Sequence, residues 1–172
     1  DDALNLNFLF QNFGSMFLEQ KDEMMISAEL SGSKLNLDEF FESLKDSEEN
    51  PESVAFPKVK MDFKLDELRY LENTFEKCSG NLSYINNRLV IKQAKFDHSK
   101  GEIEAELSIA FNNNGSEFNI FGDFKKLDIK ALFAQFNNFE QDVLKSENIS
   151  GLCTGEANFY MQFDKEYHFD PK

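Results

Sequence analysis

The stretch GEIEAELSIAF at residues 101–111 decides the fold class of this chain. Apolar side chains occupy every second position from Ile103 to Phe111, and glutamates alternate with them from Glu102 to Glu106. Because successive side chains of a β-strand point to opposite faces, this pattern predicts a strand with one apolar and one solvated face. We therefore expect a sheet whose two faces differ in chemistry.

The same alternation continues on both sides of this stretch, in residues 24–30, 59–65, 118–120 and 157–163. Asn86 and Asn87 stand between two short apolar runs, and asparagine tolerates the positive φ of a tight hairpin turn. Polar turn residues recur at 97–101 and 112–115. These signals predict four antiparallel strands from about Thr74 to Lys125, and a fold that is α+β but mainly β, built on a curved antiparallel meander.

One phrase occurs twice, as KLNLDEFFESL at residues 34–44 and KLDIKALFAQF at residues 126–136. Within each copy the apolar spacing changes from two to three and four, which is typical of a short amphipathic helix. Asn36 and Asp128 lie where an N-cap is needed. We expect these helices to pack on or cap the apolar face, in one domain of residues 1–172 with two related strand-strand-helix units at about 24–45 and 116–144. Residues 9–18 are expected to form a further helix.

The charge balance limits the partners. With 32 acidic and 18 basic residues among 172, the chain has a net charge of −14. This charge repels phosphate backbones and anionic headgroups, so nucleic acid is not an expected partner. The sequence has no apolar run long enough to span a bilayer and no leader segment, and we expect a mature form or an interior piece of a longer protein.

The residues that usually carry catalysis form no recognisable site. Nucleophile-elbow, Walker, dinucleotide-binding and metalloprotease motifs are all missing, so we expect no enzyme activity, cofactor or metal. His98 and His168 are expected to be solvated loop residues. Cys78 and Cys153 are expected to be free, buried thiols, with a single disulfide as the alternative.

The apolar face is the remaining candidate for function. The chain has 20 phenylalanines and no tryptophan, and many of the phenylalanines lie in the expected helices and strands. One interpretation is an ordinary closed core, in which helix phenylalanines cover sheet phenylalanines and exposed strand edges pair with neighbouring modules. The other is an apolar groove that stays open for the acyl chains of phospholipids. For this groove the lipid-facing candidates are Ile103, Leu107, Ile109, Phe111, Phe118 and Ile120.

The order of several phrases resembles the C-terminal region of the AsmA-like family, in the versions found in Bacteroidetes. The resemblance rests on residues 80–91 (GNLSYINNRLVI), 101–111, 127–133 (LDIKALF) and 138–151 (NFEQDVLKSENISG), and it extends over roughly residues 4–163. None of these motifs contains a catalytic residue.

The resemblance implies a periplasmic segment of a protein anchored in the inner membrane by a helix outside this chain. Larger members are regarded as long β-rich grooves that carry phospholipid toward the outer membrane. It therefore implies a non-enzymatic part in phospholipid handling and outer-membrane biogenesis, with acyl chains and neighbouring modules of the same polypeptide or other envelope proteins as partners. The alternative is a structural or interaction module with a closed core and no lipid site.

Overall fold

A computed structural model describes residues 4–12, 24–39, 57–112, 114–135, 137–140 and 142–164. Within these ranges the chain is mainly β. The strands are β1 (Leu4–Gln11), β2 (Met25–Asn36), β3 (Lys58–Tyr70), β4 (Asn73–Ile85), β5 (Arg88–His98), β6 (Gly101–Asn112), β7 (Gly115–Asp128) and β8 (Leu152–Asp164). Helix α2 (Ile129–Gln135) and the 3-10 helix η2 (Asn137–Glu140) lie between β7 and β8, and residues 37–39 are helical after β2.

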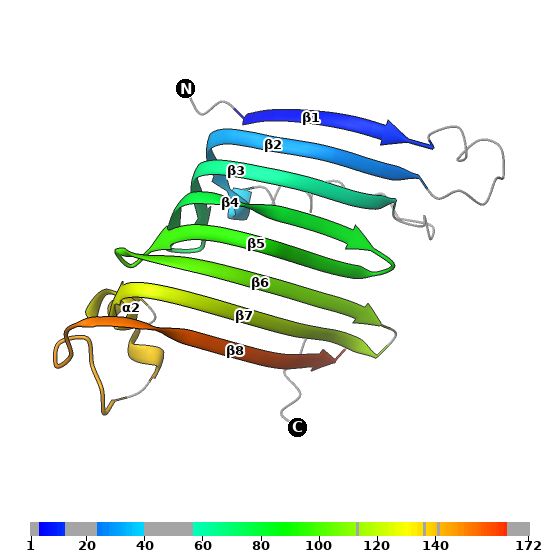
Figure 1. The fold of residues 1–172 in the computed structure, drawn as a ribbon. Coiled ribbons are helices and arrows are strands. Elements are labelled where there is room, and N and C mark those ends of the chain that lie inside the picture. Colours follow the sequence, from blue (N-terminus) through cyan, green and yellow to red (C-terminus); the bar gives the residue numbers. More distant parts are fainter. Residues whose placement is uncertain are drawn as a thin grey trace.

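All eight strands form one sheet in chain order, from β1 to β8, and the sheet curves without closing into a barrel (Figure 1). The expectation of a curved, mainly β fold is confirmed. The sheet is mixed, however, because β2 and β3 pair parallel while every other neighbouring pair is antiparallel. The helix expected at residues 9–18 is wrong for Leu9–Gln11, which belongs to β1; the rest of it lies largely outside the described residues.

Two tight turns join the central strands. Asn86 and Asn87 have φ of 51° and 57°, which is the left-handed conformation that a two-residue hairpin needs at both positions. Ser99 and Lys100, with φ of 47° and 61°, make the equivalent turn between β5 and β6. The asparagine pair therefore acts as the sequence predicts, and the four-stranded meander from β4 to β7 is confirmed.

Several strands contain a β-bulge. The pairing register shifts within β4, β5 and β7, and a residue with positive φ lies at each shift: Lys77 (52°), Gln93 (52°) and Lys126 (57°). A bulge inserts one extra residue and bends the strand. The bulges therefore contribute to the curvature of the sheet.

Both copies of the repeated phrase have an N-cap hydrogen bond at the start of the helix. The Oδ1 atom of Asn36 accepts a hydrogen bond from the backbone N–H of Asp38 (3.0 Å), and the Oδ1 atom of Asp128 accepts one from the N–H of Ala131 (3.1 Å). Each side chain satisfies an amide of the first helical turn that has no partner inside the helix. Both N-cap predictions are confirmed, whereas most of the first expected helix lies outside the described residues.

The described part of the chain has very little core. Its buried hydrophobic residues are Ala28, Leu65, Cys78, Ala94 and Leu127, and no large side chain is below 2% exposure. A packed domain of two layers would bury whole rows of large side chains. The described elements therefore form a single layer, and most of its apolar residues are only half-buried.

Candidate functional site

The sheet has one apolar face that extends across all eight strands. Residues paired across strands point to the same side, so the pairing registers assign each side chain to a face. In β1 to β4 the large members of the apolar face are Leu4, Leu6, Phe8, Phe10, Ile26, Leu30, Leu35, Val59, Met61, Phe63, Leu65, Leu68, Phe75, Leu82 and Tyr84. In β5 to β8 they are Leu89, Ile91, Phe96, Ile103, Leu107, Ile109, Phe111, Phe118, Ile120, Phe124, Leu127, Phe159, Met161 and Phe163.

The bulges keep this face continuous. Apolar residues in β4, β5 and β7 are in places three positions apart, as in Phe75 and Cys78, Ile91 and Ala94, and Phe124 and Leu127. In a regular strand, residues three apart point to opposite sides. The extra residue of each bulge restores the phase, so both members of each pair lie on the apolar face.

The structure brings the six lipid-facing candidates together on β6 and β7. Leu107 is opposite Ile120 and Ile109 is opposite Phe118 across the two strands, with Ile103 and Phe111 toward the two ends of β6. All six share the apolar face. Five are half-buried, and Phe111 is exposed. Their role in lipid binding stays a prediction.

Small residues form a row across the middle of this face. In register order the row consists of Gly80, Ala94, Ala105, Gly122 and Ala157, one residue from each strand from β4 to β8. Its neighbouring row toward the β4–β5 turn is large and apolar, with Leu82, Ile91, Leu107, Ile120 and Phe159. The large side chains of this face are therefore interrupted by a row of small ones that crosses the strands.

The two glycines of this row differ in their surroundings. At Gly80, a Cβ would lie 2.8 Å from the Cζ atom of Phe63, so the phenylalanine ring occupies the space above the glycine. At Gly122, nothing lies within 4 Å of the position a Cβ would take. The row of small residues is thus covered by a ring at Gly80 of β4 and uncovered at Gly122 of β7.

The apolar face extends over the full width of the sheet. Eight strands about 4.8 Å apart span roughly 34 Å, and strands of this length extend for about 40 Å. Its footprint is therefore on the order of 1,300 Å², and the exposed apolar surface is a part of that area. Several of its members are about half exposed, among them Phe8 (56%), Phe10 (51%) and Phe159 (57%).

Helix α2 does not bury itself against the described sheet. It follows β7 at one end of the sheet and contacts β7 and η2, and none of its residues is buried (Figure 1). Two hydrogen bonds fix this end: Ser99 Oγ donates to Gln135 Oε1 (3.3 Å) and Lys100 Nζ to Asp128 Oδ2 (2.8 Å). The helix therefore caps an end of the sheet.

The opposite face is polar and carries cross-strand ion pairs. Lys95 lies 3.1 Å from the Glu104 carboxylate and Lys77 lies 2.5 Å from that of Asp97. Hydrogen bonding from Lys95 lowers the pKa of Glu104, with the charges of Lys95 and a second lysine adding to the effect. Because these groups are exposed, their contribution to stability is small. They mark this face as the solvated one.

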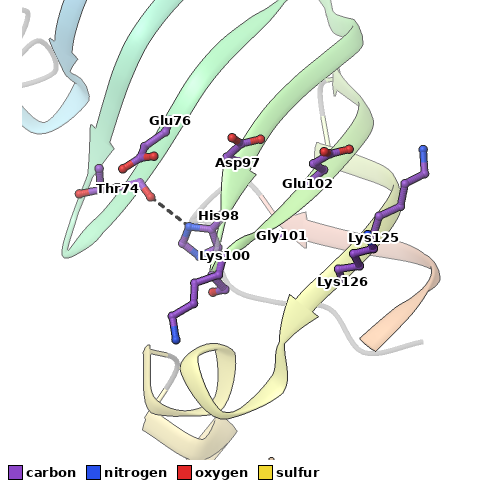
Figure 2. Close-up of a pocket in the computed structure, with 10 residues that line it drawn as sticks. Thr74, Glu76, Asp97, His98, Lys100, Gly101, Glu102, Lys125 and Lys126 are labelled. Carbon is purple, nitrogen blue, oxygen red and sulfur yellow. Dashed lines mark hydrogen bonds between the residues drawn. The ribbon is translucent and has the colours of Figure 1, made fainter. Parts of the chain in front are cut away.

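A polar cleft of about 460 Å³ lies beside the β5–β6 turn. Figure 2 shows the carboxylates of Glu76, Asp97 and Glu102 pointing together to one side, while the His98 ring points away from them. The expectation that His98 is solvated is wrong: its side chain is on the apolar face, the residue is 7% exposed, and the ring lies 4.8 Å from that of Phe75.

The hydrogen bonding of His98 argues against a catalytic role. Its Nδ1 atom is 3.0 Å from the carbonyl oxygen of Thr74, and since a carbonyl only accepts, Nδ1 carries the proton. The Nε2 atom is buried and has no hydrogen-bond partner among the described residues. A general base needs access to substrate, which the burial of this ring denies. His98 therefore serves as part of the apolar face, and His168 lies outside the described residues.

Both cysteines are free. Cys78 is 3% exposed, and burial raises the pKa of its thiol to about 11. Cys153 is half-buried at the start of β8. A thiol with so high a pKa is a poor nucleophile, so Cys78 is a packing residue.

No helix in the part of the chain that the structure describes has the length and apolar character to cross a bilayer. No group of three or more histidine, cysteine or acidic side chains there is arranged to hold a metal ion.

The apolar face is wider than the strands predicted from the sequence. Strand β1 was not among them, and its exposed Leu4, Leu6, Phe8 and Phe10 continue the apolar surface with the period-two spacing of a strand. Comparisons with family models, with curated proteins and with solved structures gave no match. The geometry of the sheet is therefore the main basis for a functional proposal.

Proposed function

We propose that this protein is a non-enzymatic lipid-handling module whose apolar sheet face binds acyl chains. The observation that carries the proposal is the continuity of that face: at least one large apolar residue from each of eight strands lies on it, and no described element is buried against it. A contiguous apolar face with half-exposed members such as Phe8, Phe10 and Phe159 often marks a binding site. A closed-core module would instead need helices buried against the sheet, and α2 has no buried residue.

The energy of such binding follows from the open geometry. A fully buried methylene gains about 0.8 kcal/mol, and an open face covers about half of a chain lying on it, or roughly 0.4 kcal/mol per methylene. A chain of about sixteen carbons then gains roughly 6 kcal/mol, from which the cost of association is subtracted. Even before that subtraction, roughly 6 kcal/mol corresponds to a dissociation constant of only about 40 μM, so we expect weak binding of one chain, at best millimolar, and tighter binding for lipids with two.

The setting of this activity is taken from the AsmA-like motifs alone. On that basis we propose a periplasmic segment of an inner-membrane-anchored protein, acting in phospholipid transfer toward the outer membrane. The negative charge on the opposite face suits a passive role, because it keeps that face in water while the apolar face holds the acyl chain.

The proposal is tested by titrating the chain with a fluorescent fatty-acyl probe, alongside native mass spectrometry for co-purified phospholipid. The test variant combines Leu107→Gln with Ile120→Gln, which makes the centre of the apolar face polar. The matched control is Phe121→Gln, because Phe121 is 42% exposed and lies next to Ile120 on the opposite face. Circular dichroism checks that both variants fold.

We expect saturable probe binding by the unsubstituted chain and by Phe121→Gln, and at least fivefold weaker binding by the double variant. Equal binding by all three proteins would place the probe elsewhere and refute the proposal. A lipid-free chain that takes up no probe at millimolar concentration would favour the closed-core module instead.

A further inference from the structure

The outer edge of β1 has an unusual composition for an edge strand. β1 pairs with β2 on one side, and among the described residues no strand pairs with its other side. All eight of its residues are exposed, including Leu4 (44%), Leu6 (47%), Phe8 (56%) and Leu9 (58%). An edge strand presents a row of backbone N–H and C=O groups to any strand that approaches it.

Nothing in the sequence of β1 protects this edge. Native proteins block edge strands with lysine or other charges, proline, or a bulge, and LNLNFLFQ contains no charged residue and no proline and pairs with β2 without a register shift. The opposite edge, β8, carries Glu156 and Asp164 and has a register shift in its pairing with β7. Two copies with a net charge of −14 each repel one another. This repulsion is weakest at β1, because the contacting strand contains no carboxylate.

We propose that β1 is a self-association edge, at which two copies of this chain pair antiparallel about a two-fold axis. In an antiparallel dimer, the residue numbers of each directly opposed pair have the same sum. Because the residues of β1 on the apolar face have even numbers, an even sum pairs them with one another and keeps the apolar faces of both copies on one side. A sum of 14 places Leu4 opposite Phe10 and Leu6 opposite Phe8, so each apolar residue meets another. Asn7 then lies opposite the Asn7 of the second copy, at the axis.

This arrangement also joins the two apolar faces. A two-fold axis perpendicular to the sheet leaves both faces on the same side, so sixteen strands would present one continuous surface. Aromatic and aliphatic pairs across strands contribute to sheet stability, as do the new backbone hydrogen bonds. The proposal does not depend on lipid binding, because it rests on the exposed backbone and composition of β1.

Disulfide trapping provides the sharpest test. In directly opposed residues of an antiparallel pair the Cα atoms are about 4.5–5.5 Å apart, which is within the range that a disulfide spans. Asn7→Cys should therefore give cross-linked dimers under mild oxidation. The matched control is Asn158→Cys, an exposed asparagine of the other edge strand, and the unsubstituted chain gives the background from Cys78 and Cys153.

Analytical ultracentrifugation supplies the second test, since it needs no oxidation. We expect the unsubstituted chain to show a concentration-dependent monomer–dimer equilibrium, and Leu6→Lys to weaken it at least tenfold because it places a charge opposite Phe8. Asn158→Lys, the matched control, should leave the equilibrium unchanged.

Three results would overturn the proposal. The first is a chain that stays monomeric at the highest soluble concentration. The second is a chain that dimerises although the Asn7→Cys variant gives no more cross-linked dimer than the unsubstituted chain. This result would indicate that the copies stack through their apolar faces. The third is cross-linking between Asn7→Cys and Asn158→Cys chains in a mixture, which would indicate head-to-tail pairing of the two edges.

Discussion

Replacing Gly101 with alanine tests whether close packing at one end of the sheet holds the strands together. Gly101 is the first residue of β6, and a Cβ there would lie 2.6 Å from the carbonyl oxygen of Lys125 and 2.7 Å from the backbone nitrogen of Leu127. These are backbone atoms of the adjacent strand β7, so a rotamer change cannot relieve the contact. The strand must move, and Leu127, which is 3% exposed, must move with it.

The expected size follows from two opposing terms. Overpacking at a site that cannot relax costs about 1–3 kcal/mol. Alanine also removes the entropic penalty of glycine in a strand, which returns roughly 0.5–1 kcal/mol. We therefore expect Gly101→Ala to lower the free energy of unfolding by about 1–2 kcal/mol. Gly122→Ala supplies the matched control, because its Cβ meets nothing within 4 Å, and it should raise stability by about 0.5–1 kcal/mol.

Urea unfolding followed by circular dichroism measures both changes. The two variants should shift the midpoint in opposite directions with an unchanged slope, since neither alters the surface that unfolding exposes by much. Equal shifts, or a stabilised Gly101→Ala, would show that β7 yields freely at this end and that the contact to Leu127 is unimportant.

Further predictions concern backbone strain, thiol reactivity and pH. Gly115→Ala should destabilise far more than Gly151→Ala in the same urea assay: both have φ above 130°, but a Cβ on Gly115 would lie within bonding distance of a carbonyl oxygen of β8, whereas Gly151 faces open space. Alkylation at about pH 8, followed by mass spectrometry, should modify Cys153 well before Cys78, because burial raises the pKa of Cys78 to about 11. Asp128→Ala should lower stability at about pH 6, and the deficit should shrink in strong acid: hydrogen bonding to a lysine holds the pKa of Asp128 below its ordinary 3.8, so the contribution of its charge is present above that value and is lost as the pH falls through the folded-state pKa.

The sequence predicted the features that depend on local pattern. Alternation placed Ile103 to Phe111 on one face, and the Asn86-Asn87 pair predicted a hairpin, because both signals act within a few residues. The N-caps Asn36 and Asp128 were found for the same reason. The central strands and their turns, and hence the middle of the candidate site, could therefore be assigned without coordinates.

Features that depend on pairing between distant residues could not be assigned. The parallel pairing of β2 with β3 joins Ile26 to Val59, and nothing in either strand distinguishes a parallel partner from an antiparallel one. The bulges at Lys77 and Gln93 disrupt the period-two pattern, so Phe75 and Cys78 appear to lie on opposite faces until the registers are known. His98 was placed in solvent because its sequence neighbours are polar, while the side chain packs on a ring from another strand.

The unequal distribution of charge explains why one sheet can carry both proposed activities. Charged residues, including ion pairs such as Lys95–Glu104, lie on one face of the sheet. The net charge of −14 repels other acidic molecules at distances up to about a Debye length, which is roughly 8 Å in physiological salt. An uncharged acyl chain does not feel this barrier and can lie on the apolar face. A second copy of the chain does feel it, and the repulsion is smallest where the contacting strand carries no charge, which is the case at β1. Raising the ionic strength should therefore strengthen dimerisation through screening, while acyl-chain binding should respond only to the weaker effect of salt on apolar burial.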